Sequence, residues 1–169
     1  KKNKKYMKSL IQHINEKLKV TKNMLKQNMK YHPKTNDELK ELVEQLIKER
    51  GNEADLNDID TSEITDMSRL FKYSKFNGDI SKWNVSNVEN MEWMFGYSKF
   101  NGDISKWDVR NVINMHHMFY TSQFNNDISR WNVSSVITME EMFRDCEFNG
   151  DVSNWDVSSV TDMTHMFQK

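Results

Sequence analysis

A block of 24 residues repeats along most of this chain without insertion or deletion. Segment 76–83 reads FNGDISKW, and close copies of it begin at Phe100, Phe124 and Phe148. A second block, MxxMF, begins at Met91 and recurs with the same spacing. Because every copy keeps one register, each unit must follow the same backbone path. The repeat therefore predicts a solenoid of about 4.5 stacked coils.

Each unit is expected to contain one short strand and one short helix. Ile80 and Trp83 are strand-forming residues that follow a turn-forming Asn-Gly-Asp sequence. Ser86 and Glu89 match a helix capping box, and apolar residues continue at helical spacing as far as Phe95. One unit is too small to fold alone, so its stability must come from contacts between coils. The predicted fold class is therefore α/β.

The sequence divides into three parts. Residues 1–32 form a basic segment that is predicted to be helical, and residues 33–52 contain a second predicted helix. That second helix begins with a capping box at Thr35 and ends at Gly51, and we expect it to cover the open end of the repeats at 53–169.

Charge and composition exclude several classes of protein. Residues 1–50 hold 14 Lys and Arg against 6 Asp and Glu, whereas residues 51–169 hold 10 against 19. The repeats are therefore net acidic, and we expect no nucleic-acid partner. There is no apolar run long enough for a membrane-spanning segment. The lone cysteine, Cys146, has no partner for an internal disulfide.

The repeat FNGDISxWxVSxVxxMxxMF resembles that of the BspA-like leucine-rich-repeat surface proteins, a bacterial group of unknown function that is abundant in mycoplasmas. The resemblance covers residues 53–169, and the KTNDEL sequence at 34–39 resembles the helix that precedes the family's repeats. It implies a leucine-rich-repeat-like solenoid that is secreted or displayed on the cell surface, with a role in adhesion or host-protein binding. It transfers no catalytic residue to this chain.

Stacked coils turn each repeat position into a row of side chains, and rows that vary from coil to coil are the best candidates for specific binding. The first such row, here called the variable row, consists of Arg69, Trp93, His117, Glu141 and His165. A basic row consists of Lys82, Lys106 and Arg130. Trp93 is an aromatic residue at an otherwise polar position, which suits an anchor for a protein partner. The basic row fits either an acidic partner or, as we favour, compensation of a neighbouring row of aspartates.

Two other interpretations of these rows carry less weight. The repeated tryptophans would suit a glycan if they faced solvent, but an aromatic residue fixed among apolar neighbours favours a place in the core. They are Trp83, Trp107, Trp131 and Trp155. His117, Glu141 and His165 share a row, but a solvated face is a better interpretation than a zinc site. We therefore expect no metal site.

The sequence contains no catalytic constellation that interrupts the repeat, so we expect neither enzymatic activity nor a cofactor. Our leading hypothesis is a non-enzymatic surface or secreted protein that binds other proteins. The alternative is an assembly module that forms a homo-oligomer through its N-terminal helices and its uncapped coil at Phe167. The weaker alternative is glycan binding through aromatic rows. The partner's identity and the face that binds it stay open.

Overall fold

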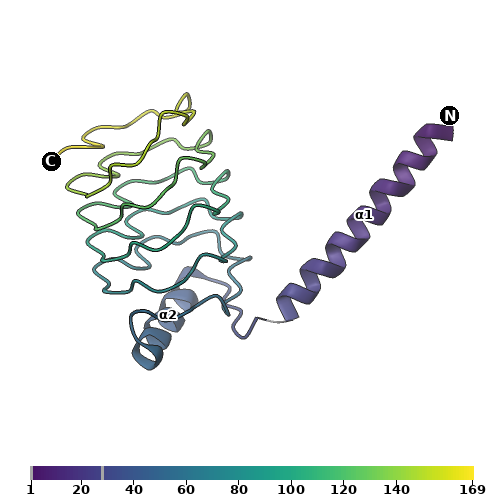
Figure 1. Cartoon of the computed structure of the whole chain (residues 1–169), viewed down its shortest axis with the longest axis horizontal. Helices are drawn as coiled ribbons and strands as arrows, with labels where there is room; N and C mark the ends of the chain where they lie inside the picture. Colours follow the sequence, from purple (N-terminus) through teal and green to yellow (C-terminus); the bar gives the residue numbers. More distant parts are fainter. Residues whose placement is uncertain (1, 28) are drawn as a thin grey trace.

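The computed structural model describes residues 2–27 and 29–169, and in it two helices precede a stack of irregular coils (Figure 1). Helix α1 comprises Lys2–Gln27 and helix α2 comprises Asn36–Arg50. The predicted basic segment at 1–32 thus contains one long helix, although residues 1 and 28 of that segment lie outside the described part. Neither helix has the length and apolarity that a membrane span requires.

Helix α2 is built as its sequence predicts. The Thr35 hydroxyl accepts a hydrogen bond from the Glu38 N–H (3.2 Å), and the Glu38 carboxylate accepts one from the Lys34 N–H (2.7 Å). At the other end Gly51 has a φ of 89°, and its N–H donates to the Ile47 carbonyl (2.8 Å). The buried face consists of Leu39, Val43 and Leu46. These residues join α2 to the core of the coils.

The predicted α/β class is wrong. Among the described residues after Gly51, the chain forms neither a helix nor an extended strand, and only isolated parallel bridges join residues 24 apart, such as Asn90 and Asn114. A leucine-rich-repeat-like coil with a short strand and a short helix is therefore absent from this part of the molecule. The coils are made of successive turns instead.

Hydrogen bonding explains why the helical prediction failed. The Met91 N–H donates to the Asn114 carbonyl of the next coil (2.9 Å), whereas the Met94 N–H closes a turn onto the Met91 carbonyl (3.1 Å). Both methionines are buried, so a series of turns produces the apolar spacing that a helix would also show. The expected capping box is likewise absent, because the Glu89 N–H donates to the Thr65 carbonyl of the preceding coil (2.8 Å).

Repeated aromatic side chains fill a continuous core between the coils. The rings of Phe95 and Phe119 stack with centroids 5.5 Å apart, and the same contact recurs along the stack. Trp107 is only 4% exposed, and its indole N–H donates to the Ile80 carbonyl (3.2 Å). The other repeated tryptophans are also buried, and each donates its indole N–H to the backbone carbonyl 27 residues earlier. They are Trp83, Trp131 and Trp155. The prediction that the repeated tryptophans belong to the core is confirmed. The faces of their rings are therefore unavailable to a glycan.

Candidate functional site

The variable row lies on a wall of the stack whose backbone is a series of turns. Every residue of this row has a left-handed φ, between 51° and 60°. Left-handed backbone costs a residue with a side chain about 1 kcal/mol or more, so other bonds must hold it. The Trp93 N–H donates to the His116 carbonyl of the next coil (3.0 Å), and the Gly96 N–H closes a turn onto the Trp93 carbonyl (3.1 Å).

A cluster of exposed and half-buried rings, here called the aromatic patch, covers this wall. It consists of Tyr73, Trp93, Tyr97, His117 and Tyr120. Trp93 stacks on His117 of the next coil with centroids 4.1 Å apart and planes within 13°, and Tyr73 stacks on Tyr97 at 4.8 Å. Tyr73 is 67% exposed and Tyr97 is 39% exposed. Such rings combine a large apolar area with few rotatable bonds, which favours binding.

Gly96 makes room for the indole of Trp93. A Cβ atom at this position would stand 2.5 Å from Cε3 of the Trp93 ring, which is closer than real atoms approach. The neighbouring coils carry Lys72 and Tyr120 at the same place in the repeat. Glycine is therefore needed in this coil because the indole lies against its backbone.

A cation covers one face of the Trp93 ring. The Lys72 ammonium of the preceding coil lies 3.6 Å from the centre of the indole. Burial lowers the pKa of Lys72, and the nearby positive charge of Arg69 lowers it further. Arg69 is itself paired with Glu92 at 3.0 Å. With Lys72 on one side and His117 on the other, the two faces of Trp93 are both occupied.

The side chain of His117 is mostly buried. Burial lowers its pKa, the neighbouring His116 lowers it further, and the carboxylate of Glu141 only partly opposes them. The Nε2 atom of His117 lies 3.0 Å from Glu141, while its buried Nδ1 has no hydrogen-bond partner among the described residues. Arg144 also binds Glu141, at 2.8 Å. These contacts fix the plane of the imidazole against Trp93.

The structure brings most of the variable row together. Trp93 stacks on His117, and Glu141 lies beside His117, while Arg69 pairs with Glu92, the neighbour of Trp93 in the sequence. His165 follows on the last coil, where it is exposed. Within the described part of the chain, no group of three or more His, Cys, Asp or Glu residues is arranged to hold a metal ion.

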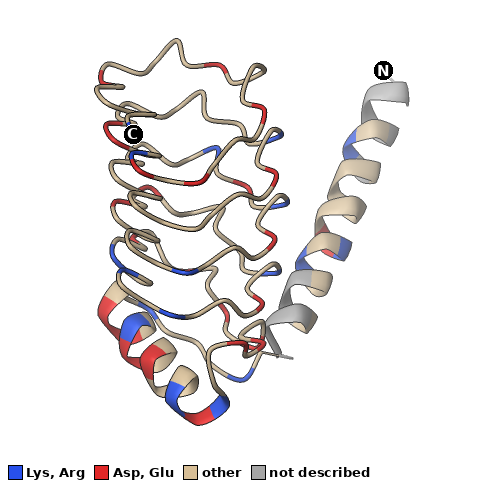
Figure 2. Ribbon diagram, turned by 60° about the vertical axis from the view of Figure 1, so that its left-hand side comes forward, with Lys and Arg blue, Asp and Glu red and all other residues tan. Residues whose placement is uncertain are grey.

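The basic row lies beside the aspartate turns. Its members are Lys82, Lys106 and Arg130, all exposed. Hydrogen bonds from Ser81 are the main cause of the lowered pKa of Asp79, and the positive charge of Lys82 lowers it further. Acidic residues, coloured red, recur along the ribbon of the coils in Figure 2. This arrangement favours the interpretation that the basic row compensates the aspartates.

Sequence reasoning missed the tyrosines of the patch. Tyr73 and Tyr97 are 24 residues apart, lie outside the apolar core set, and follow Arg69 and Trp93 by four residues. That recurrence could have identified them as a second exposed row. Tyr120 could not have been found in this way, because it occupies a different position in its unit.

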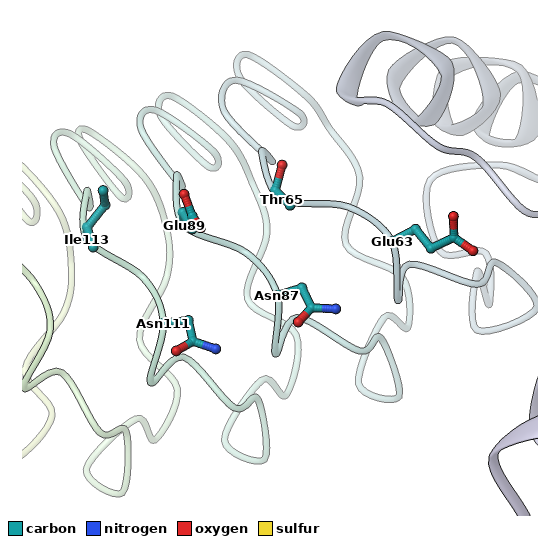
Figure 3. A pocket seen from close by; sticks show the side chains of 6 residues that line it. All are labelled: Glu63, Thr65, Asn87, Glu89, Asn111 and Ile113. Carbon is teal, nitrogen blue, oxygen red and sulfur yellow. The ribbon is translucent and has the colours of Figure 1, made fainter. Parts of the chain in front are cut away.

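Figure 3 shows a shallow groove at another side of the coils. Its lining residues are Glu63, Thr65, Asn87, Glu89, Asn111 and Ile113. The Asn87 amide donates to the Ser62 carbonyl (2.8 Å), and Asn111 makes the same bond to its own preceding coil (2.7 Å). Glu63 is paired with Lys34 at 2.6 Å. Most polar groups of the groove thus hold the stack together, which makes the aromatic patch the stronger candidate.

The repeats match a model of a known protein family. The family described as "Mycoplasma protein of unknown function, DUF285" matches residues 37–147 and 120–169. These matches cover the coils and nearly all of α2, and α1 lies outside them. No curated protein and no solved structure matches the chain.

Proposed function

The chain belongs to the DUF285 family of Mycoplasma proteins of unknown function, and from that premise we propose that it binds a protein partner through the aromatic patch. In this proposal the chain has no chemistry of its own, and the coils serve to display the patch. The resemblance to BspA-like surface proteins supports a location on the cell surface or outside the cell, with a role in adhesion or host interaction.

The single observation that carries this proposal is the ordered stacking of the half-buried Trp93 with the exposed Tyr73 and Tyr97 at the surface. Tryptophan and tyrosine are enriched among the residues that dominate binding energy at protein interfaces. Here their rings are fixed by stacking before any partner arrives, so little conformational entropy is lost on binding. The ion pairs of Arg69 with Glu92 and of Glu141 with Arg144 border the rings, as the polar rim of an interface does.

The same geometry weakens the case for a glycan. Sugars stack on the free face of an aromatic ring, but the faces of Trp93 are occupied by Lys72 and His117. Tyr97 likewise has Tyr73 stacked on it. These stacking contacts leave less ring face for a sugar than free aromatic rings would offer.

The proposal is tested by retention of surface proteins on the immobilised full chain. A protein retained by the native chain should be held about tenfold or more weakly by Trp93→Ala, because truncating a central aromatic anchor costs about 2 kcal/mol or more. Gly96→Ala should have the same direction of effect, since it displaces the indole without removing it. Ile137→Ala, an exposed apolar residue outside the patch, is the matched control. Equal retention by all four chains would refute the proposal.

An assembly role is the second candidate, and it is supported by exposed apolar side chains on the last coil. Met163 and Phe167 are both about half exposed, whereas their counterparts Met139 and Phe143 are buried. Light scattering across a concentration series would test this role. A mass that rises with concentration and falls back in Phe167→Asp would support assembly through this coil, and a constant monomer mass would exclude it.

A further inference from the structure

Helix α1 carries an apolar stripe that no other described part of the chain covers. The stripe consists of Met7, Leu10, Ile11, Ile14 and Leu18, each between 42% and 54% exposed. Their spacings of three, one, three and four positions place them on one side of a helix. The core of the molecule includes none of the described α1 side chains, and α1 projects away from the coils in Figure 1.

The chain is fastened to the first coil soon after α1. The Lys30 N–H donates to the Asp58 carbonyl (2.8 Å), and the Asp60 N–H donates to the Tyr31 carbonyl (2.8 Å). Arg50 closes the same region by pairing with Asp58 at 2.9 Å. The chain is therefore bound to the first coil from Lys30 onward, whereas the stripe faces solvent rather than forming part of the fold.

Charge decides which kind of surface can cover the stripe. Residues 1–27 contain nine lysines and one acidic residue, Glu16. Lys8 and Lys17 lie next to the stripe, so two copies of α1 packed through it would bring like charges together. Glu16 is already hydrogen-bonded by Gln12 (3.2 Å). The opposite charge must therefore come from outside this helix.

We propose that α1 binds to an anionic lipid surface, with its apolar stripe inserted at the boundary between headgroups and acyl chains. A lysine-rich helix with a narrow apolar stripe is the type that lies in the plane of a membrane interface. The described stripe is aliphatic throughout, without the aromatic anchor that a protein pocket would favour. Each lysine close to an anionic surface strengthens binding by about fivefold. This role is independent of the aromatic patch, which lies on the coils.

The test is co-sedimentation of the full chain with lipid vesicles. Vesicles of phosphatidylcholine with about one third phosphatidylglycerol should bind the chain, and vesicles of pure phosphatidylcholine should bind it at least about tenfold more weakly. High salt should release the chain from the anionic vesicles. Ile14→Gln removes one aliphatic side chain from the stripe. Val20→Gln makes a similar change about 120° around the helix, and it is the matched control because Val20 is also exposed.

We expect Ile14→Gln to weaken vesicle binding about tenfold or more, because it loses most of the burial of an isoleucine. The vesicle affinity of Val20→Gln should stay within about threefold of that of the native chain. Equal binding by the two variants would overturn the proposal, and so would equal binding to neutral and anionic vesicles. A chain that self-associates without vesicles, and stops doing so in Ile14→Gln, would show that a second copy covers the stripe instead. Trp93→Ala should bind vesicles normally, which separates this test from that of the proposed function.

Discussion

The two ends of the stack of coils differ in how their backbone groups and apolar side chains are covered. At the first coil, the Asn36 amide of α2 donates to the Asp66 carbonyl (3.0 Å) and to the Ser68 carbonyl (3.3 Å). In the next coil the equivalent oxygens accept backbone N–H groups from the coil before, as the Asn90 carbonyl does from Met67 (2.9 Å). One side chain of α2 therefore replaces the bonds that a preceding coil would make.

The last coil presents the complementary groups without such a cap. The Met139 N–H donates to the Asp162 carbonyl (2.8 Å), but the described residues offer no acceptor to the Met163 N–H. Phe167 is 53% exposed, whereas Phe143 one coil earlier is 2% exposed. On the wall of the variable row, each coil thus turns carbonyls toward α2 and N–H groups toward the open end, whereas elsewhere the bonds run the other way, as from the Glu89 N–H to the Thr65 carbonyl. The comparison teaches that a coil is complete only when both of its sides are covered.

The largest expected effect comes from removing apolar contact at the covered end. Leu46→Ala should lower the free energy of unfolding by about 2–5 kcal/mol, because Leu46 is buried between α2 and the first coil. Phe167→Ala should cost less than about 1 kcal/mol, since half of its ring already faces water. Urea denaturation followed by tryptophan fluorescence measures both. Equal losses would show that the last coil is covered in solution.

This difference between the ends also shows what a sequence of this kind can predict. The capping box at Thr35 identified α2, because its bonds lie within one local segment, whereas the same pattern at Ser86 and Glu89 caps no helix. The spacing of Met91, Met94 and Phe95 led to the wrong prediction of a helix, because apolar residues at these intervals suit both a helix and a series of turns. Whether the Met91 N–H bonds within its own segment or to the next coil depends on stacking, which local propensity does not encode.

The candidate binding site, like the fold, could be predicted only in part from the sequence. Variation along a row identified Trp93 and His117, because a repeat keeps its core positions constant and lets exposed positions change. Their stacking could not be predicted, since it depends on the left-handed backbone of the row and on the space left by Gly96. Burial of the His117 ring follows from that stacking, and so does its lowered pKa.

The cap itself can be broken with one substitution. Asn36→Ala should lower the free energy of unfolding by about 1–2 kcal/mol, because two partly buried carbonyls of the first coil lose their donor. Gln45→Ala, on the exposed side of the same helix, should change it by less than about 0.5 kcal/mol. Thermal and urea unfolding of the two variants would measure the difference. A loss in Asn36→Ala no greater than in Gln45→Ala would mean that water caps these carbonyls equally well.

The smallest expected effect is electrostatic and depends on pH. The hydrogen bond from Arg50 lowers the pKa of Asp58 below its usual value near 3.8, and burial opposes this only in part. A lowered carboxyl pKa stabilises the fold above the unfolded value, and the gain is lost as the pH falls through the folded value. Asp58→Asn should therefore reduce the free energy of unfolding by less than about 1 kcal/mol at pH 7, and by still less at pH 3.

The open end supplies the control for this ion pair. Asp156 on the last coil has its pKa lowered by hydrogen bonds from Ser158 rather than by a cation. Asn84 accepts the same kind of bond from Ser86 in an earlier coil, so Asp156→Asn should keep the turn and leave stability almost unchanged at both pH values. Urea denaturation of the two variants at pH 7 and pH 3 makes the comparison. If Asp58→Asn and Asp156→Asn lost the same stability at pH 7, the ion pair between Arg50 and Asp58 would add nothing to the covered end. Apolar contact with α2 and the amide of Asn36 would then account for the whole difference in stability between the two ends.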